Sequence, residues 1–178
     1  MNYEPIIDAL IAREGGFVDH PADRGGATRY GITEAVARKN GYVGPMQELP
    51  ESFARAVYRK RYIVEPRFDM VASVDPDIAA ELIDTGVNCG PSVASVFLQR
   101  CLNVFNQQGS RYADLFIDGR IGSVTVDALR AYCRWRGADG VKVMVKTLNN
   151  LQAVRYIELA ENDPAQESFV YGQIANRT

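Results

Sequence analysis

The chain has 178 residues, of which 47% are hydrophobic and 24% are charged. This composition supplies enough apolar side chains for a folded core and excludes an intrinsically disordered chain. The formal net charge of −2 does not favour a nucleic-acid partner, because nucleic-acid-binding proteins typically carry a basic excess or stripe.

The first predicted element is an amphipathic helix that ends at Glu14, before two glycines. Glu14 continues a helically spaced stripe of three aliphatic residues, Ile7, Leu10 and Ile11. Partial desolvation and the negative end of the helix dipole both raise the pKa of a carboxyl group in such a position. A glycosidase needs a protonated carboxylic acid to protonate its leaving group, so Glu14 is the candidate general acid. A helix end with its side chain in water is the simpler interpretation of an isolated Glu-Gly-Gly.

A loop rich in glycine, acids and hydroxyls follows this helix. Gly25 and Gly26 can adopt the positive φ angles of a tight turn, so residues 18–33 are predicted to form a short irregular β-hairpin. That hairpin would return Asp23 and Thr28 toward Glu14. A second carboxylate there could position or activate a water molecule that the Thr28 hydroxyl shares. Asp23 is the first candidate and Asp19 the second, although an Asx turn explains either residue taken alone.

Further helices are predicted on both sides of a soft boundary near residue 70. Thr33 begins one helix, and Pro50 begins another that carries Tyr58 and Tyr62 on one stripe. Aromatic residues four positions apart are more typical of a core than of a sugar platform. After the boundary, Asp75-Pro76 begins a helix that Gly90-Pro91 ends, and another helix follows. The buried positions predicted for the first of these two are Ile78, Ala79, Leu82 and Ile83.

The last third of the chain is predicted to contain a glycine turn and a long helix. The turn is Asp118-Gly119-Arg120-Ile121-Gly122, and Asp118 or Ser123 would cap the helix after it. The long helix spans residues 141–161 and should support the core through its apolar positions. These are Val143, Leu148, Leu151, Val154, Ile157 and Leu159.

The cysteines and the single histidine give no metal-site pattern. Cys89, Cys101 and Cys133 are odd in number and far apart, so they predict buried free thiols and neither a disulfide framework nor a zinc site. His20 lies alone in the loop, where a solvated side chain is expected. We therefore expect no metal and no cofactor.

One stretch resembles the phage and prophage N-acetylmuramidases of glycoside hydrolase family 108. It begins with Glu14-Gly15-Gly16-Phe17, continues through the acidic loop with Gly25-Gly26, and ends with Thr28-Arg29-Tyr30-Gly31-Ile32-Thr33. The similarity covers nearly the whole chain, including residues 58–62, 87–91, 98–100 and 118–125. The spacing of Glu14, Asp23 and Thr28 also resembles that of phage-type lysozymes.

The chain departs from the family pattern at three positions. Asp19 stands where asparagine is expected, and Ile63 and Gln173 stand where tryptophan is expected. Glu14 is unaffected. Asp19 adds a carboxylate beside the candidate site, so the choice between Asp19 and Asp23 as the second acid stays open.

The resemblance implies a mainly α, lysozyme-like helical fold with a short irregular β-hairpin after the first helix. Residues 1–70 would form the catalytic region. Residues 71–178 resemble small helical peptidoglycan-binding modules, although the turn could serve packing alone. Tyr30 would stack on a sugar, and Tyr58 and Tyr62 are further candidate substrate contacts.

The function implied is that of a peptidoglycan hydrolase, a lysozyme that cleaves the β-1,4 bond between N-acetylmuramic acid and N-acetylglucosamine. Glu14 would donate the proton, Asp23 or Asp19 would stabilise the transition state or activate water, and Thr28 would orient that water. The role would be phage lysis or cell-wall remodelling for secretion. Two alternatives remain: a lytic transglycosylase acting on the same bond, and a non-catalytic peptidoglycan-binding protein.

The expected partners are peptidoglycan glycan strands, with no nucleic acid, no stable membrane insertion and a monomeric state. Residues 1–13 lack the pattern of a signal peptide, and no stretch approaches the ~20 apolar residues of a membrane span. We therefore expect synthesis in the cytoplasm, followed by action on the periplasmic or extracellular wall. Release would need a holin or a dedicated export route.

Overall fold

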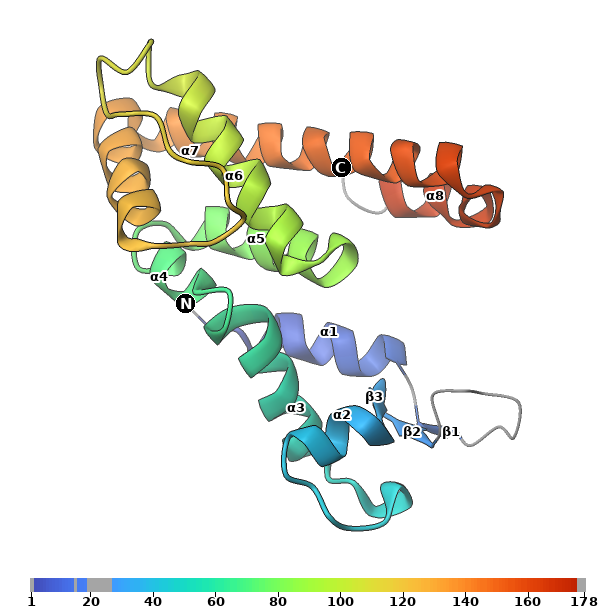
Figure 1. Cartoon of the computed structure of the whole chain (residues 1–178). Helices are drawn as coiled ribbons and strands as arrows, with labels where there is room; N and C mark the ends of the chain where they lie inside the picture. Colours follow the sequence, from blue (N-terminus) through green and yellow to red (C-terminus); the bar gives the residue numbers. More distant parts are fainter. Residues whose placement is uncertain (1, 15, 19–26, 176–178) are drawn as a thin grey trace. The chain divides into compact units, whose positions relative to one another are not determined.

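The structure is a computed structural model that describes residues 2–14, 16–18 and 27–175 (Figure 1). The chain divides into two compact units, Met1–Ile63 and Val64–Thr178, which are described separately. The fold is mainly α, as predicted.

The first unit begins with α1 (Glu4–Glu14). This helix ends at the predicted residue, and the stripe of Ile7, Leu10 and Ile11 is buried, as its spacing indicated. The remaining elements of this unit are β1 (Phe17–Val18), β2 (Thr28–Arg29), β3 (Ile32–Thr33), α2 (Glu34–Lys39), a 3₁₀ turn (Met46–Glu48) and α3 (Glu51–Arg59). The predicted helix starts are confirmed, since the Thr33 hydroxyl accepts a hydrogen bond from the Val36 amide at the start of α2, and Pro50 precedes α3.

The three short strands form an antiparallel sheet in the order β1-β2-β3. Strands β2 and β3 are joined by the two residues Tyr30 and Gly31, whose φ angles are 51° and 72°. Positive φ at both positions is the geometry of a tight hairpin turn that matches the strand twist. The predicted pairing of the segment after α1 with Thr28 is therefore confirmed, and a second hairpin at Tyr30-Gly31 adds to it. The predicted turn at Gly25-Gly26 lies outside the described residues.

The second unit is built around α5, which packs against α4, α6 and α7. The four apolar positions predicted for α5 (Ile78, Ala79, Leu82 and Ile83) are all fully buried, which confirms that face. The Asp75 carboxylate caps the helix by accepting hydrogen bonds from the amides of Asp77 and Ile78, each at 3.0 Å. The elements of this unit are α4 (Phe68–Ala72), α5 (Pro76–Cys89), α6 (Pro91–Phe105), α7 (Ser123–Asn162), a 3₁₀ turn (Pro164–Gln166) and α8 (Glu167–Ala175). A π-helical turn (Lys60–Val64) before α4 contains the boundary between the two units.

The loop between α6 and α7 is held by one buried glutamine. Gln99 is 1% exposed, and its side-chain amide donates to Asp118 Oδ1 at 2.8 Å while its Oε1 accepts from the Gly119 amide at 2.9 Å. The bond from the Gln99 amide, and a further one from the Arg120 amide, lower the pKa of Asp118. The capping role predicted for Asp118 or Ser123 is wrong: Gly122 is the N-cap of α7, without a side-chain cap bond, because Asp118 is used within the turn.

Helix α7 contains a break at Gly137, where φ is 60° and ψ is −156°. The break separates residues 123–136 from residues 138–162, and the predicted long helix lies within the second segment. A hydrogen bond of 2.8 Å from the Tyr132 hydroxyl to the Gly140 carbonyl bridges the break. A Cβ atom at Gly140 would lie 2.1 Å from Arg136 Cβ, so this turn also needs a residue without a side chain.

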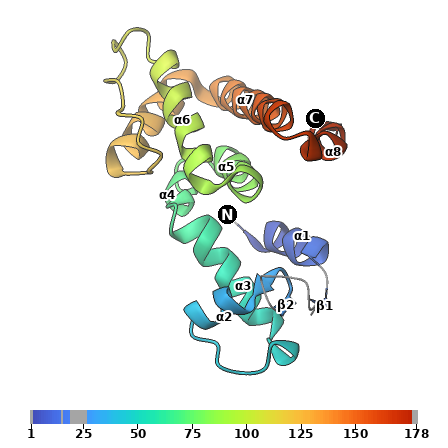
Figure 2. The ribbon, with the colours of Figure 1, turned by 45° about the vertical axis from the view of Figure 1, so that its right-hand side comes forward.

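The core face predicted for the long helix is only partly correct. Leu148 is fully buried, but Val143, Val154 and Ile157 are about half exposed. The stripe that faces the core instead contains Met144, Leu148, Gln152 and Tyr156. Gln152 is polar, so the hydrophobicity of the sequence alone does not predict that it faces the core. Figures 1 and 2 show α8 beside the last turns of α7.

The three cysteines are free thiols, as predicted, but only Cys101 is buried. Cys89 and Cys133 are half-buried. Desolvation raises the pKa of Cys101 and of Cys133 to about 11, so both thiols are neutral near pH 7. Within the described residues, no helix combines the length and apolar character needed to cross a bilayer.

We expect Gly137→Ala to lower the free energy of unfolding by ~1–3 kcal/mol, because a Cβ atom makes the Gly137 backbone conformation strained. Urea unfolding followed by circular dichroism measures this. Gly172→Ala is the control, since Gly172 lies in α8 with open space around its Cα and should gain helix propensity. Equal free energies for the two variants would contradict the assignment of strain to Gly137.

Candidate active site

Glu14 is the last residue of α1, and β1 begins soon after it at Phe17. Val18 of β1 pairs with Thr28 of β2, so the sheet returns Thr28 beside the segment that leaves α1 (Figure 1). Thr28 therefore pairs with a strand that begins three residues after Glu14, and a shared site for the two side chains stays a prediction. Asp19, Asp23 and His20 lie outside the described residues, as does the side chain of Glu14. The pairing of Glu14 with a second carboxylate stays a prediction.

The strand register places Thr28 on the face of the sheet opposite to the core. Ile32 is 3% exposed and pairs with Arg29, whereas Thr28 pairs with Thr33. Successive residues of a strand point to opposite faces, so Thr28 lies on the face that Ile32 does not occupy. Thr28 is half-buried in this strand, and its water-orienting role stays a prediction.

The turn that carries Tyr30 is held by Tyr58 of α3. The Tyr58 hydroxyl donates a hydrogen bond of 2.7 Å to the Tyr30 carbonyl oxygen, and the Tyr58 side chain is buried. This bond supports a backbone conformation that a tyrosine adopts only at a cost, because its φ is positive. The guanidinium of Arg29 lies 5.2 Å from the centre of the Tyr30 ring. Tyr30 is thus fixed from both its main chain and its ring.

Tyr58 and Tyr62 stack on each other, with ring centres 6.1 Å apart and planes inclined by 19°. Arg61 lies over the Tyr62 ring at 5.3 Å. The three tyrosines predicted as substrate contacts are therefore neighbours in the structure, linked through Tyr58. Because Tyr58 is buried, it positions the other two, and sugar contact by Tyr30 and Tyr62 stays a prediction.

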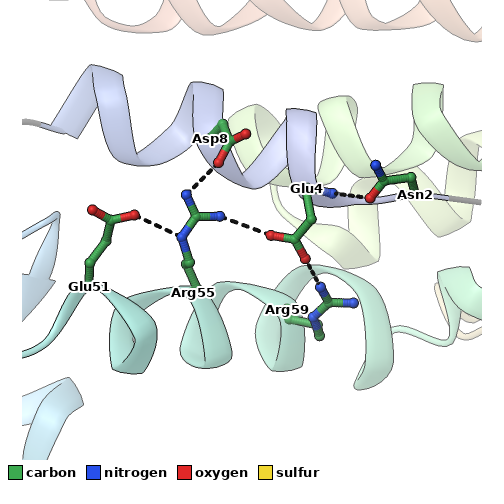
Figure 3. Close-up of polar contacts among 6 residues, drawn as sticks. All are labelled: Asn2, Glu4, Asp8, Glu51, Arg55 and Arg59. Atoms are coloured by element: carbon green, nitrogen blue, oxygen red, sulfur yellow. Dashed lines mark hydrogen bonds and ion pairs between the residues drawn. The ribbon is translucent and has the colours of Figure 1, made fainter.

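A cluster of ion pairs joins α1 to α3 and fixes the helix that carries Glu14 (Figure 3). The Arg55 guanidinium donates to Glu4 at 2.9 Å, to Glu51 at 2.8 Å and to Asp8. Arg59 pairs with the other oxygen of Glu4. The bonds to Asp8, which contributes most, and to Glu51 raise the pKa of the Arg55 guanidinium above its ordinary value. One cation thus bridges two successive turns of α1 to α3.

The sequence predicts the two helix faces that form this cluster, but it does not predict that they meet. Glu4 and Asp8 are four residues apart, and so are Glu51, Arg55 and Arg59, which places each set on one helix face. Nothing in the spacing says that the two faces meet, because Arg55 and Asp8 are 47 positions apart. That pairing arises only from the packing of α1 on α3.

The described residues contain no group of three histidine, cysteine, aspartate or glutamate side chains that could hold a metal ion.

Comparison with known protein families assigns both parts of the chain. Residues 7–90 match the family model of glycosyl hydrolase 108, and residues 93–178 match that of a predicted peptidoglycan domain. The chain is a glycosyl hydrolase 108 domain joined to a predicted peptidoglycan domain. Together these assignments support a glycoside hydrolase that acts on peptidoglycan.

The fold of this hydrolase is similar to a solved structure described as that of Brucella abortus SagA. The TM-score is 0.58 at 23% sequence identity, and the match covers 98% of this chain and 94% of the other. At this identity, the similarity shows a shared fold. No curated protein matches the sequence.

The hydrolase region does not coincide with the first compact unit. The unit ends at Ile63, whereas the family match continues to residue 90 and so includes α4 and α5. Those two helices therefore belong to the hydrolase family by sequence and pack in the second unit. The boundary predicted near residue 70 stays a prediction.

We expect Arg55→Met to lower the melting temperature, because it leaves Glu4, Asp8 and Glu51 close together without their shared cation. The effect should shrink in 1 M salt, where charge repulsion is screened over about 3 Å. Arg155→Met is the control, since Arg155 has one exposed partner, Glu158. A melting temperature lowered no further by Arg55→Met than by Arg155→Met would show that the cluster adds nothing to stability.

Proposed function

We propose that this protein is a lysozyme that cleaves the β-1,4 bond between N-acetylmuramic acid and N-acetylglucosamine in peptidoglycan. The observation that carries the proposal is the position of Glu14. It is the last residue of α1, it occupies the next position of the buried Ile7, Leu10 and Ile11 stripe, and the sheet with Thr28 follows directly. The match of residues 7–90 to glycosyl hydrolase 108 supports this assignment.

Glu14 acts as the general acid. The carbonyl end of α1 carries a partial negative charge that disfavours a carboxylate at that end, so the protonated form is favoured. A protonated Glu14 can donate its proton to the glycosidic oxygen as the bond breaks. The proton leaves with the released sugar hydroxyl, and water supplies the group that completes hydrolysis.

The second carboxylate is Asp23, with Asp19 as the alternative. It stabilises the positive charge that develops on the sugar ring or activates the attacking water. The Thr28 hydroxyl orients that water, and Tyr30 stacks against a sugar ring. The biological role is phage lysis or cell-wall remodelling for secretion, and the site of action is the wall outside the cytoplasmic membrane.

Glu14→Gln should reduce the rate of peptidoglycan cleavage at least ~100-fold, because it removes the proton donor and preserves the side-chain shape. The measurement is mass spectrometry of soluble fragments from purified sacculi. Wild-type protein should release fragments with reducing muramic ends. Half of the wild-type rate in the variant would exclude Glu14 as the acid, and anhydro-muramic ends would identify a lytic transglycosylase.

A pair of matched variants separates the two candidate carboxylates. Asp23→Asn should cost more than ~100-fold in turnover, whereas Asp19→Asn should cost less, since asparagine at position 19 is the residue expected from the family resemblance. Both are measured by turbidity loss of a sacculus suspension at saturating substrate. The reverse order of the two effects would assign the second acid to Asp19.

A further inference from the structure

The second unit contains an open pocket, and none of the residues that line it is a candidate catalytic residue. Its volume is about 370 Å³, and it is lined by Ser73, Val74, Arg130, Cys133 and Arg134. Ser73 and Val74 come from the connection between α4 and α5, and the other three residues come from the first segment of α7. A pocket of this size accommodates a small ligand or a short peptide.

The charge of this pocket is positive on one side. Arg130 and Arg134 are four residues apart on α7, so their guanidinium groups extend from the same helix face. Arg130 has one partner, Asp127, at 3.2 Å, and both of those side chains are substantially exposed. Arg134 makes no ion pair with any residue in the described part of the chain. The Asp75 carboxylate, next to Val74 in the chain, accepts hydrogen bonds from the amides of Asp77 and Ile78 at the start of α5.

The other side of the pocket is apolar or neutral. Val74 provides an aliphatic wall, and burial keeps the Cys133 thiol protonated by raising its pKa to about 11. The Ser73 hydroxyl donates to the Met70 carbonyl at 2.6 Å, so its remaining capacity is as an acceptor. The pocket thus offers two planar cations beside a small apolar wall. Guanidinium groups bind planar carboxylates through paired hydrogen bonds.

We propose that this pocket binds a carboxylate-bearing stem peptide of peptidoglycan. The ligand class rests on the proposed function and on the match of residues 93–178 to a predicted peptidoglycan domain. A stem peptide combines free carboxylates with short aliphatic groups, which fits Arg134 and Val74 together. A phosphate polymer would use the arginines and leave the apolar wall without a role. Ser73 and Val74 belong to the hydrolase match and α7 to the peptidoglycan match, so the pocket joins both regions.

The test measures binding of the tripeptide L-Ala-γ-D-Glu-meso-diaminopimelate to the full-length protein by calorimetry. Arg134→Met keeps the aliphatic stem and removes the charge, and should weaken binding at least about tenfold, the value of one charge-assisted hydrogen bond. Arg134→Lys keeps the positive charge but loses the planar pair of N–H donors, and should give an intermediate affinity. The control is Arg155→Met on the same helix, which loses a similar exposed pair and should bind as the wild type does.

Equal affinities of the wild type and Arg134→Met would overturn the proposal. Equal competition by inorganic phosphate would also overturn it, in favour of a phosphate polymer such as a teichoic acid. Glu14→Gln separates this inference from the proposed function, since it should abolish cleavage of sacculi and retain tripeptide binding. Cleavage by a wild type that does not bind the tripeptide removes only the pocket assignment, and binding without cleavage removes only the lysozyme assignment.

Discussion

The packing of α1 on α3 is the constraint on which the candidate active site depends. The buried stripe of α1 holds the helix against the first unit, but an apolar stripe alone permits sliding along the helix axis. Arg55 prevents this, because it binds Glu4 and Asp8 on two successive turns of α1. A slip of one turn would move Glu14 by about 5.4 Å, which is far more than catalytic geometry tolerates. The electrostatic cluster therefore fixes the position of the helix that carries the proposed general acid.

The second unit depends on a comparable link between α5 and α7. Glu81 Oε2 accepts from the Asn149 amide at 2.8 Å, and Asp84 accepts from Gln152 at 3.2 Å. Gln152 is 1% exposed and also donates to the Tyr156 hydroxyl at 3.0 Å. Burying a carboxylate at a helix interface costs free energy unless hydrogen-bond donors compensate for the lost water. The side-chain amides of Asn149 and Gln152 provide those donors for Glu81 and Asp84. The last helix of the hydrolase match thereby shares its core with the peptidoglycan match.

Because of this shared core, the boundary between the two family matches differs from the boundary between the two compact units. The family boundary falls after residue 90, at the tight turn between α5 and α6, where Gly90 has a φ of 96°. The compact units divide earlier, at Ile63. Helices α4 and α5 thus belong to the hydrolase by ancestry and to the second unit by packing. Such an arrangement makes the stability of the peptidoglycan region dependent on residues of the hydrolase.

The sequence by itself determined the features that local chemistry controls. The helix starts at Thr33, Pro50 and Asp75-Pro76 were predictable, because a cap or a proline acts within one turn of its own position. The end of α1 at Glu14 and the buried face of α5 followed from glycine placement and from helical spacing. The mainly α fold was predictable for the same reason, since each helix carries its own periodic signal.

Only the tertiary structure decided the features that join distant residues. Sequence spacing cannot predict which distant residues bind each other. Examples are the ion pairs of Arg55, the hydrogen bond from Tyr58 to the Tyr30 carbonyl and the hydrogen bond from Gln99 to Asp118. The exposure of Val143, Val154 and Ile157 had the same cause, because the buried Gln152 of α7 donates a hydrogen bond to Asp84 of α5 and its helix face therefore meets α5. Periodicity reports which residues share a helix face. Which face is buried, and against what, depends on partners that only the folded chain brings together.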